Sequence, residues 1–100
     1  MDYRSLGRIG MQVSAVRLGT MLFGGAIDEH EAAALVDCAL GHGINSIETA
    51  NIYGRGRSEE ILGQVVARTG KRQRLVLATK VHVPMDDQDP NAGGNHRHRW

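Results

Sequence analysis

Short apolar runs alternate with longer amphipathic segments along most of this chain, and this alternation constrains the fold more than any other feature. Three of the runs are predicted strands, at residues 16–21, 44–50 and 75–81. The segments between them place apolar residues at helical spacing. Strands that alternate with helices imply a parallel sheet with right-handed crossovers. The predicted fold class is therefore α/β, with three parallel strands alternating with two helices.

Both helical segments carry signals that mark their ends. Asp28 is the predicted N-cap of the first helix, and Glu31 three positions later completes a capping-box pattern. Ser58 is predicted to cap the second helix, and Gly70 follows its end, where a left-handed residue is usual. Cys38 lies on the first helix and is interpreted as a small, packed apolar residue.

The chain divides into three regions. Residues 1–14 are predicted to form a hairpin, because short apolar runs there are broken by Gly7 and Gly10. Residues 15–82 hold the βαβαβ alternation. Residues 83–100 contain two prolines and two glycines without periodicity, which predicts a loop or a disordered tail.

Composition excludes several classes of protein. Twelve basic and eleven acidic residues nearly cancel, so the net charge does not attract nucleic acid or an anionic membrane. No apolar run approaches the roughly 20 residues of a membrane span. The single cysteine rules out an internal disulfide, and the charged start MDYRSLGR lacks the apolar core of a signal peptide. These features predict a soluble, cytoplasmic protein.

Residues able to take part in catalysis or binding lie where the predicted strands end, and βα folds place their functional sites there. Six side chains or backbone positions share this rim: Gly19, Thr20, Met21, Glu48, Tyr53 and Lys80. Glu48 directly follows an apolar run, and burying an unpaired carboxylate costs several kcal/mol. Lys80, at the end of the neighbouring strand, is in a position to neutralise it.

A tyrosine, a lysine and a carboxylate at one rim suit proton transfer. A phenol has an ordinary pKa of about 10, and a neighbouring ammonium lowers that pKa by stabilising the phenolate. Tyr53 is then able to protonate a carbonyl oxygen while hydride reaches the carbon. The alternative is an ordinary surface ion pair between Glu48 and Lys80 beside a half-buried Tyr53. Spacing alone favours this simpler alternative.

Three stretches resemble the N-terminal part of aldo-keto reductases in order and spacing: YRSLGRIGMQVSAVRLGTMLFGG, GINSIETANIYGRGRSEEILG and LVLATKVHVPM. The resemblance covers nearly all of residues 1–100. It implies a (β/α)8 TIM barrel preceded by an N-terminal β-hairpin, of which this chain would form the first part. It also implies NADPH-dependent reduction of aldehydes or ketones, with a small carbonyl compound as substrate.

The resemblance assigns roles to individual residues. Tyr53 matches the family's proton-donating tyrosine and Lys80 matches the lysine that tunes it. Glu48 stands where the family has an aspartate. The extra methylene shifts the carboxylate by more than about 1 Å, and a misplacement of that order can cost ~100-fold in rate. The family's histidine follows the fourth strand, so His82 is not its equivalent. Gly19, Thr20, Met21 and Glu48 match the loop and strand end beside the nicotinamide.

A complete TIM barrel needs about 250 residues. The chain is therefore expected to form a partial barrel with little or no NADPH binding and no turnover on its own. The alternative is a non-enzymatic remnant, or a partial barrel that assembles with another chain through open sheet edges. No nucleic-acid or membrane partner is expected.

Three other features have simpler interpretations. The stretch GRGRS, residues 54–58, is favoured as a solvated turn over an anion site, because it lacks the lysine of a phosphate loop. His96 and His98 are favoured as part of a basic, disordered end over a weak metal site, so no metal is predicted. The basic segment at residues 71–74 is interpreted as a solvated turn.

Overall fold

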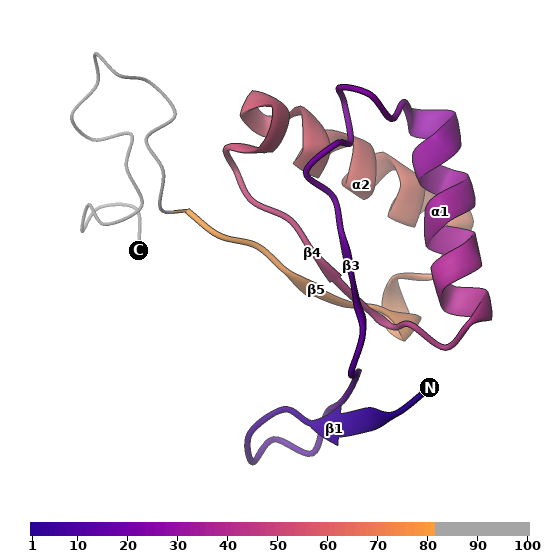
Figure 1. Cartoon of the computed structure of the whole chain (residues 1–100), viewed down its shortest axis with the longest axis vertical. Coiled ribbons are helices and arrows are strands. Elements are labelled where there is room, and N and C mark those ends of the chain that lie inside the picture. The colour runs from indigo at the N-terminus through magenta and orange to yellow at the C-terminus, as the bar shows by residue number, and fades with distance from the viewer. Residues whose placement is uncertain (82–100) are drawn as a thin grey trace.

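The computed structural model describes residues 1–81. Its elements run along the chain in the order shown in Figure 1: β1 (Tyr3–Ser5), β2 (Gln12–Ser14), β3 (Arg17–Gly19), α1 (Glu29–Gly41), β4 (Ser46–Glu48), the 3₁₀ turn η1 (Tyr53–Gly56), α2 (Arg57–Thr69), the 3₁₀ turn η2 (Arg72–Arg74) and β5 (Val76–Ala78). The predicted tail at 83–100, including His96 and His98, lies outside the described residues, as does His82.

The three strands β3, β4 and β5 form one parallel sheet in that order, so the α/β prediction is confirmed. Each strand is three residues long, shorter than the predicted runs. Backbone pairing nevertheless extends past the ends of β4 and β5. Thr49 N donates to Ala78 O at 2.8 Å, and Asn51 N donates to Lys80 O at 3.0 Å. This extension carries the rim residues beyond the regular strands.

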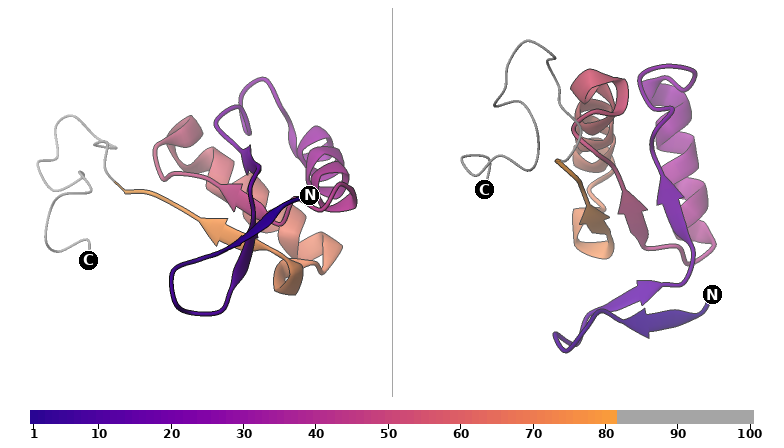
Figure 2. Two further views of the ribbon diagram at one scale, coloured as in Figure 1. Left: turned by 60° about the horizontal axis from the view of Figure 1, so that its bottom comes forward. Right: turned by 60° about the vertical axis from the view of Figure 1, so that its left-hand side comes forward.

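Both helices pack on one face of the sheet, as Figures 1 and 2 show. Leu18, Ile47 and Leu77 are register partners, and this row faces the helices. Ile47 is fully buried at its centre. The buried core comprises Phe23, Ala32, Val36, Leu40, Ile47, Ile61, Leu62, Val65, Val66 and Leu75. The predicted helical stripes supply most of this list, because period-3.6 apolar residues share one helix face.

Two of the predicted helix caps are present in the structure, and one is not. Asp28 accepts from Glu31 N at 2.9 Å in a capping box, and Gly70 ends α2 with φ 66°. Ser58, however, is not an N-cap. Gly56 takes that position with φ 97°, and Ser58 lies buried in the first turn of α2. The predicted packing of Cys38 is also wrong, since the cysteine is exposed.

The predicted N-terminal hairpin is present, with β1 and β2 paired antiparallel. It lies at the end of the sheet where the parallel strands begin (Figures 1 and 2). Tyr3 OH donates to Gly43 O at 2.6 Å, and Ser14 N donates to Asn45 Oδ1 at 2.8 Å. These bonds fasten the hairpin to the turn that precedes β4.

Neither α1 nor α2 is long and apolar enough to cross a membrane, and residues 1–81 contain no other α-helix.

Candidate active site

Tyr53 and Lys80 meet beyond the ends of β4 and β5. Lys80 Nζ donates to Tyr53 OH at 2.8 Å and lies 5.0 Å from the centre of the ring. The hydrogen bond to Tyr53 raises the pKa of Lys80 above its ordinary value of 10.5, desolvation opposes this rise, and the charges of Tyr53 and Glu48 add to it. Lys80 is therefore an ammonium at neutral pH, held against the phenol oxygen.

Glu48 lies between two cations. Its Oε1 is 3.9 Å from Lys80 Nζ, as the strand-end argument predicted. Its Oε2 is closer to Arg17 Nη1, at 3.4 Å. Sequence reasoning missed Arg17. The signal available was its position in the strand, two residues before Gly19, because alternate residues of a strand share a face.

Buried hydroxyl groups hold the loops of the site together. Ser58 Oγ donates toward Thr20, 2.7 Å from its carbonyl oxygen and 2.9 Å from its Oγ1. Thr20 Oγ1 donates to Glu48 O at 3.1 Å, and Thr49 Oγ1 lies 3.3 Å from Ser58 Oγ. Thr20, Thr49 and Ser58 are all buried. Ser58 thus links the loop after β3 to the end of β4 through Thr20 and Thr49. The sequence suggested only a helix cap at this position.

Glycine is required where two loops of the site touch. Gly24 has φ +85°, and a Cβ built there would lie 2.4 Å from Arg57 Cγ. Gly54 also has positive φ, and a Cβ there would lie 3.4 Å from Phe23 O. The loop after β3 and the turn that follows Tyr53 therefore lie in direct contact.

The residues predicted to contact a cofactor line one cleft. It measures about 340 Å³ and is bounded by Gly19, Thr20, Met21, Leu22, Phe23, Ile27, Leu35, Glu48 and Tyr53. Met21 is 65 % exposed and is open to contact. Thr20 contributes to the wall, but its hydroxyl is already used by Glu48 O. The cleft joins the predicted cofactor positions to the predicted proton donor.

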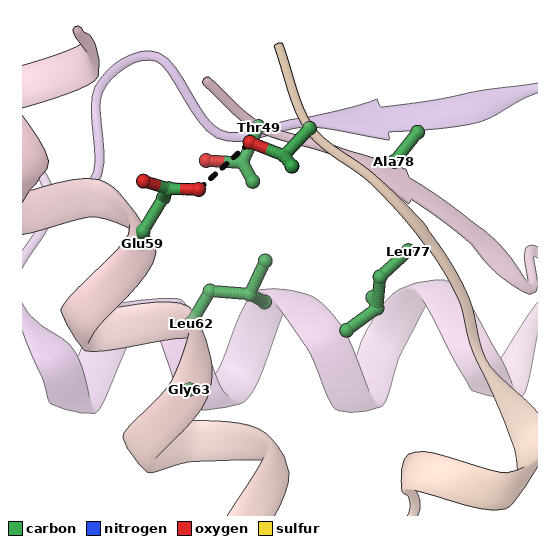
Figure 3. Close-up of a pocket in the computed structure, with 7 residues that line it drawn as sticks. Thr49, Glu59, Leu62, Gly63, Leu77 and Ala78 are labelled. Atoms are coloured by element: carbon green, nitrogen blue, oxygen red, sulfur yellow. Dashed lines mark hydrogen bonds between the residues drawn. The ribbon is translucent and has the colours of Figure 1, made fainter. Parts of the chain in front are cut away.

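A second cavity, of about 210 Å³, lies between α2 and the ends of β4 and β5. Leu62 and Leu77 point into it, and Thr79 Oγ1 donates to Glu59 Oε2 at 2.7 Å at its edge (Figure 3). Tyr53, Glu48 and Lys80 do not line it. It shares Thr49 with the hydroxyl cluster but contains none of the three candidate catalytic residues.

The other basic and metal-binding candidates add nothing to this site. The GRGRS stretch forms η1 and the start of α2, with Arg55 at φ 53°. The predicted basic turn contains η2, and its Lys71 forms an ion pair with Asp37 at 2.7 Å. Within residues 1–81, no three His, Cys, Asp or Glu side chains gather as they would around a metal ion.

Comparison with known proteins identifies relatives over most of the chain. It is 47 % identical over 100 residues to the uncharacterized oxidoreductase YrpG of Bacillus subtilis, covering 95 % of this chain and 30 % of that protein. It is 40 % identical over 84 residues to the aldo-keto reductase YhdN of B. subtilis, covering 80 % of this chain and 25 % of that protein. It is 37 % identical over 83 residues to a probable voltage-gated potassium channel subunit beta of Arabidopsis thaliana, covering 81 % of this chain and 25 % of that protein.

Solved structures show the same relationship. A putative aldo-keto reductase of Pseudomonas aeruginosa matches with a TM-score of 0.73 and 43 % identity, covering 87 % of this chain and 33 % of the other. The holo form of an aldo-keto reductase of Bacillus halodurans matches with a TM-score of 0.73 and 34 % identity, covering 90 % and 29 %. The sheet described here is accordingly part of a TIM barrel.

The chain spans less than a third of the length of these curated relatives. The sequence model of the aldo/keto reductase family matches residues 15–99. This match covers most of the chain, and the protein therefore belongs to the aldo/keto reductase family.

Proposed function

We propose that this chain supplies the proton-donating part of an oxidoreductase site that reduces aldehydes or ketones with NADPH. The observation that supports this most directly is the 2.8 Å hydrogen bond from Lys80 Nζ to Tyr53 OH beside a cleft of about 340 Å³. An ammonium at this distance stabilises the phenolate that forms when Tyr53 gives up its proton. The family membership of the chain supports the same chemistry.

In this mechanism Tyr53 is the general acid. Its hydroxyl donates a proton to the carbonyl oxygen of the substrate, which thereby becomes an alcohol oxygen. Lys80 holds the phenol oxygen and stabilises the negative charge left on it. The Glu48 carboxylate lies 3.9 Å from the same ammonium. A reduced nicotinamide held in the cleft would supply the hydride for the new C–H bond.

The cleft suits one end of this cofactor. Its volume is at the lower end of the range for small-molecule sites, roughly 300–1,000 Å³. Met21 and Gly19 offer an apolar wall for a flat ring, and Glu48 lies on the same wall for contact with a ribose hydroxyl. The described residues show three strands of a fold that has eight, so we expect NADPH binding by the isolated chain to be weak or absent.

A chimera tests this proposal. Residues 1–100 would replace the matching segment of the B. subtilis oxidoreductase YrpG, which is 47 % identical over that length. We expect the chimera to oxidise NADPH with aldehydes or ketones, while the isolated chain does not. The unmodified relative is the positive control. A folded chimera that remains inactive across a broad carbonyl panel, while the relative is active, would contradict the proposal.

A second candidate is a partial barrel that associates with another chain. In the described residues, β3 and β5 each pair with β4 alone, so each has an edge without a strand partner there. We expect the isolated chain to show concentration-dependent association in analytical ultracentrifugation. Ala78→Lys, at an exposed position of the edge strand β5, should weaken it, whereas Ala67→Lys, at an exposed position of α2, should not. A monomer at all concentrations would contradict this candidate.

A further inference from the structure

We propose that Arg17 is a positioning residue that draws the Glu48 carboxylate away from Lys80 and so preserves positive charge beside Tyr53. This inference rests on the proposed function, because it concerns the environment of the proton donor. It assigns a role to a side chain that the expected set of Glu48, Tyr53 and Lys80 does not include.

The sheet register places Arg17 within reach of Glu48. Leu18 and Ile47 are register partners that face the helices, so their chain neighbours point to the opposite, open face. Arg17 and Glu48 are among these neighbours. Arg17 is paired with Ser46, two residues before Glu48 on β4, which makes the two charged side chains diagonal neighbours on one face.

Gly19 leaves the sheet face beside Glu48 uncovered. It is the direct register partner of Glu48, so any side chain there would stand beside the carboxylate. A Cβ built at Gly19 would meet nothing within 4 Å. Glutamate has one methylene more than aspartate, and its carboxylate reaches to within 3.4 Å of Arg17 Nη1 on this face.

The distances show that Glu48 is shared between the two cations. Arg17 Nη1 is 3.4 Å from Oε2, and Lys80 Nζ is 3.9 Å from Oε1. Both exceed the 2.7–2.9 Å or so of a strong charge-assisted hydrogen bond. The side chains of Arg17 and Glu48 are 46 % and 38 % exposed, and pairs this exposed contribute little to folding stability. The pair is better explained by its effect on the neighbouring charges.

The charge balance gives that effect a direction. Arg17 and Lys80 carry two positive charges, and Glu48 carries one negative charge, so the group retains a net positive charge next to Tyr53. If Arg17 were absent, Glu48 would be free to pair fully with Lys80, and the two would cancel. Glu59 accepts a hydrogen bond from Thr79 Oγ1 and keeps its own negative charge, which the loss of Arg17 would not change. A net positive charge favours the phenolate that proton donation leaves behind.

The pKa of Lys80 reports this sharing without requiring activity. In the full chain, labelled lysine side chains would be titrated by NMR in the wild type and in Arg17→Met. We expect the Lys80 pKa to rise, because a carboxylate released toward an ammonium stabilises its charged form. Arg68→Met is the matched control, since Arg68 pairs with Glu29 on the helical side and should leave Lys80 unchanged.

A double variant separates positioning from direct repulsion between the two cations. In a Glu48→Gln background, the Arg17→Met change should raise the Lys80 pKa by much less, because the carboxylate that moves is gone. An equal rise in both backgrounds would overturn the proposal, and so would an unchanged Lys80 pKa in Arg17→Met. Arg17→Gln gives the same test if Arg17→Met does not fold.

The titration tests the role of Arg17, and the chimera tests the proposed function, so either proposal can fail without the other. Coupling of Arg17 to Lys80 through Glu48 in a protein whose chimera is inactive would refute the proposed function but leave the coupling established. An active chimera without this coupling would overturn the role of Arg17 alone.

Discussion

Tyr53→Phe in the chimera with the B. subtilis relative is expected to lower the rate of carbonyl reduction by about 10²–10⁴-fold, the contribution usual for a positioned general acid. The substitution removes only the hydroxyl that would donate the proton, and Tyr53 is only half-buried, so the fold should be unaffected. The rate of NADPH oxidation at saturating aldehyde measures the effect.

Tyr3→Phe is the matched control for this experiment. Tyr3 also uses its hydroxyl in a hydrogen bond, to Gly43 O, but it lies in the hairpin at the opposite end of the sheet. Its loss should leave the rate within a few-fold of the parent chimera. In Tyr53→Phe the Lys80 pKa should also fall toward 10.5, because the hydrogen bond that raises it is gone. Equal rates in the two variants would exclude Tyr53 as the acid.

Ile47→Ala should cause the largest loss of stability of any single truncation in the sheet. Ile47 is fully buried at the centre of the row that faces the helices. Truncating a buried isoleucine costs about 2–5 kcal/mol, since packing is lost and a cavity remains. A small domain has only about 5–15 kcal/mol of unfolding free energy in total. We therefore expect a strongly lowered urea midpoint, or loss of cooperative unfolding.

Leu35→Ala removes comparable apolar volume from a different environment. Leu35 is 38 % exposed on α1, and the buried core cluster does not include it. It should change the unfolding free energy much less than Ile47→Ala does. Urea denaturation followed by circular dichroism compares the two variants directly. Similar midpoints would mean that the helix-facing row is not the centre of the core.

The fold could be predicted because its main determinants are local. The capping box of Asp28 and Glu31 and the left-handed Gly70 each depend on a few neighbouring residues, so the sequence displays them directly. The predicted strands are longer than the regular ones, although backbone hydrogen bonds continue beyond β4 and β5 as far as Asn51 and Lys80. Cys38 was misjudged because a position on an amphipathic helix does not reveal whether the facing surface is covered.

The site was only partly predictable. The meeting of Tyr53, Lys80 and Glu48 follows from strand order, since the ends of parallel strands share one edge of a sheet. Predicting the contact between Arg17 and Glu48 requires the sheet register and the side-chain directions, and no local sequence pattern contains either. Ser58 was missed because its partners, Thr20 and Thr49, come from two different loops. From the sequence alone Ser58 resembles a helix N-cap, because its contacts with those two loops appear only in the folded chain.

The hydroxyl cluster of Thr20, Thr49 and Ser58 has a consequence for how such a site can vary. Thr49 and Ser58 bracket the segment that carries Tyr53, and both ends are fastened to the same buried point. The span between them acts as a closed loop of fixed length. Adding or removing a residue in this span would move the phenol away from Lys80. The length of this span therefore sets the position of Tyr53.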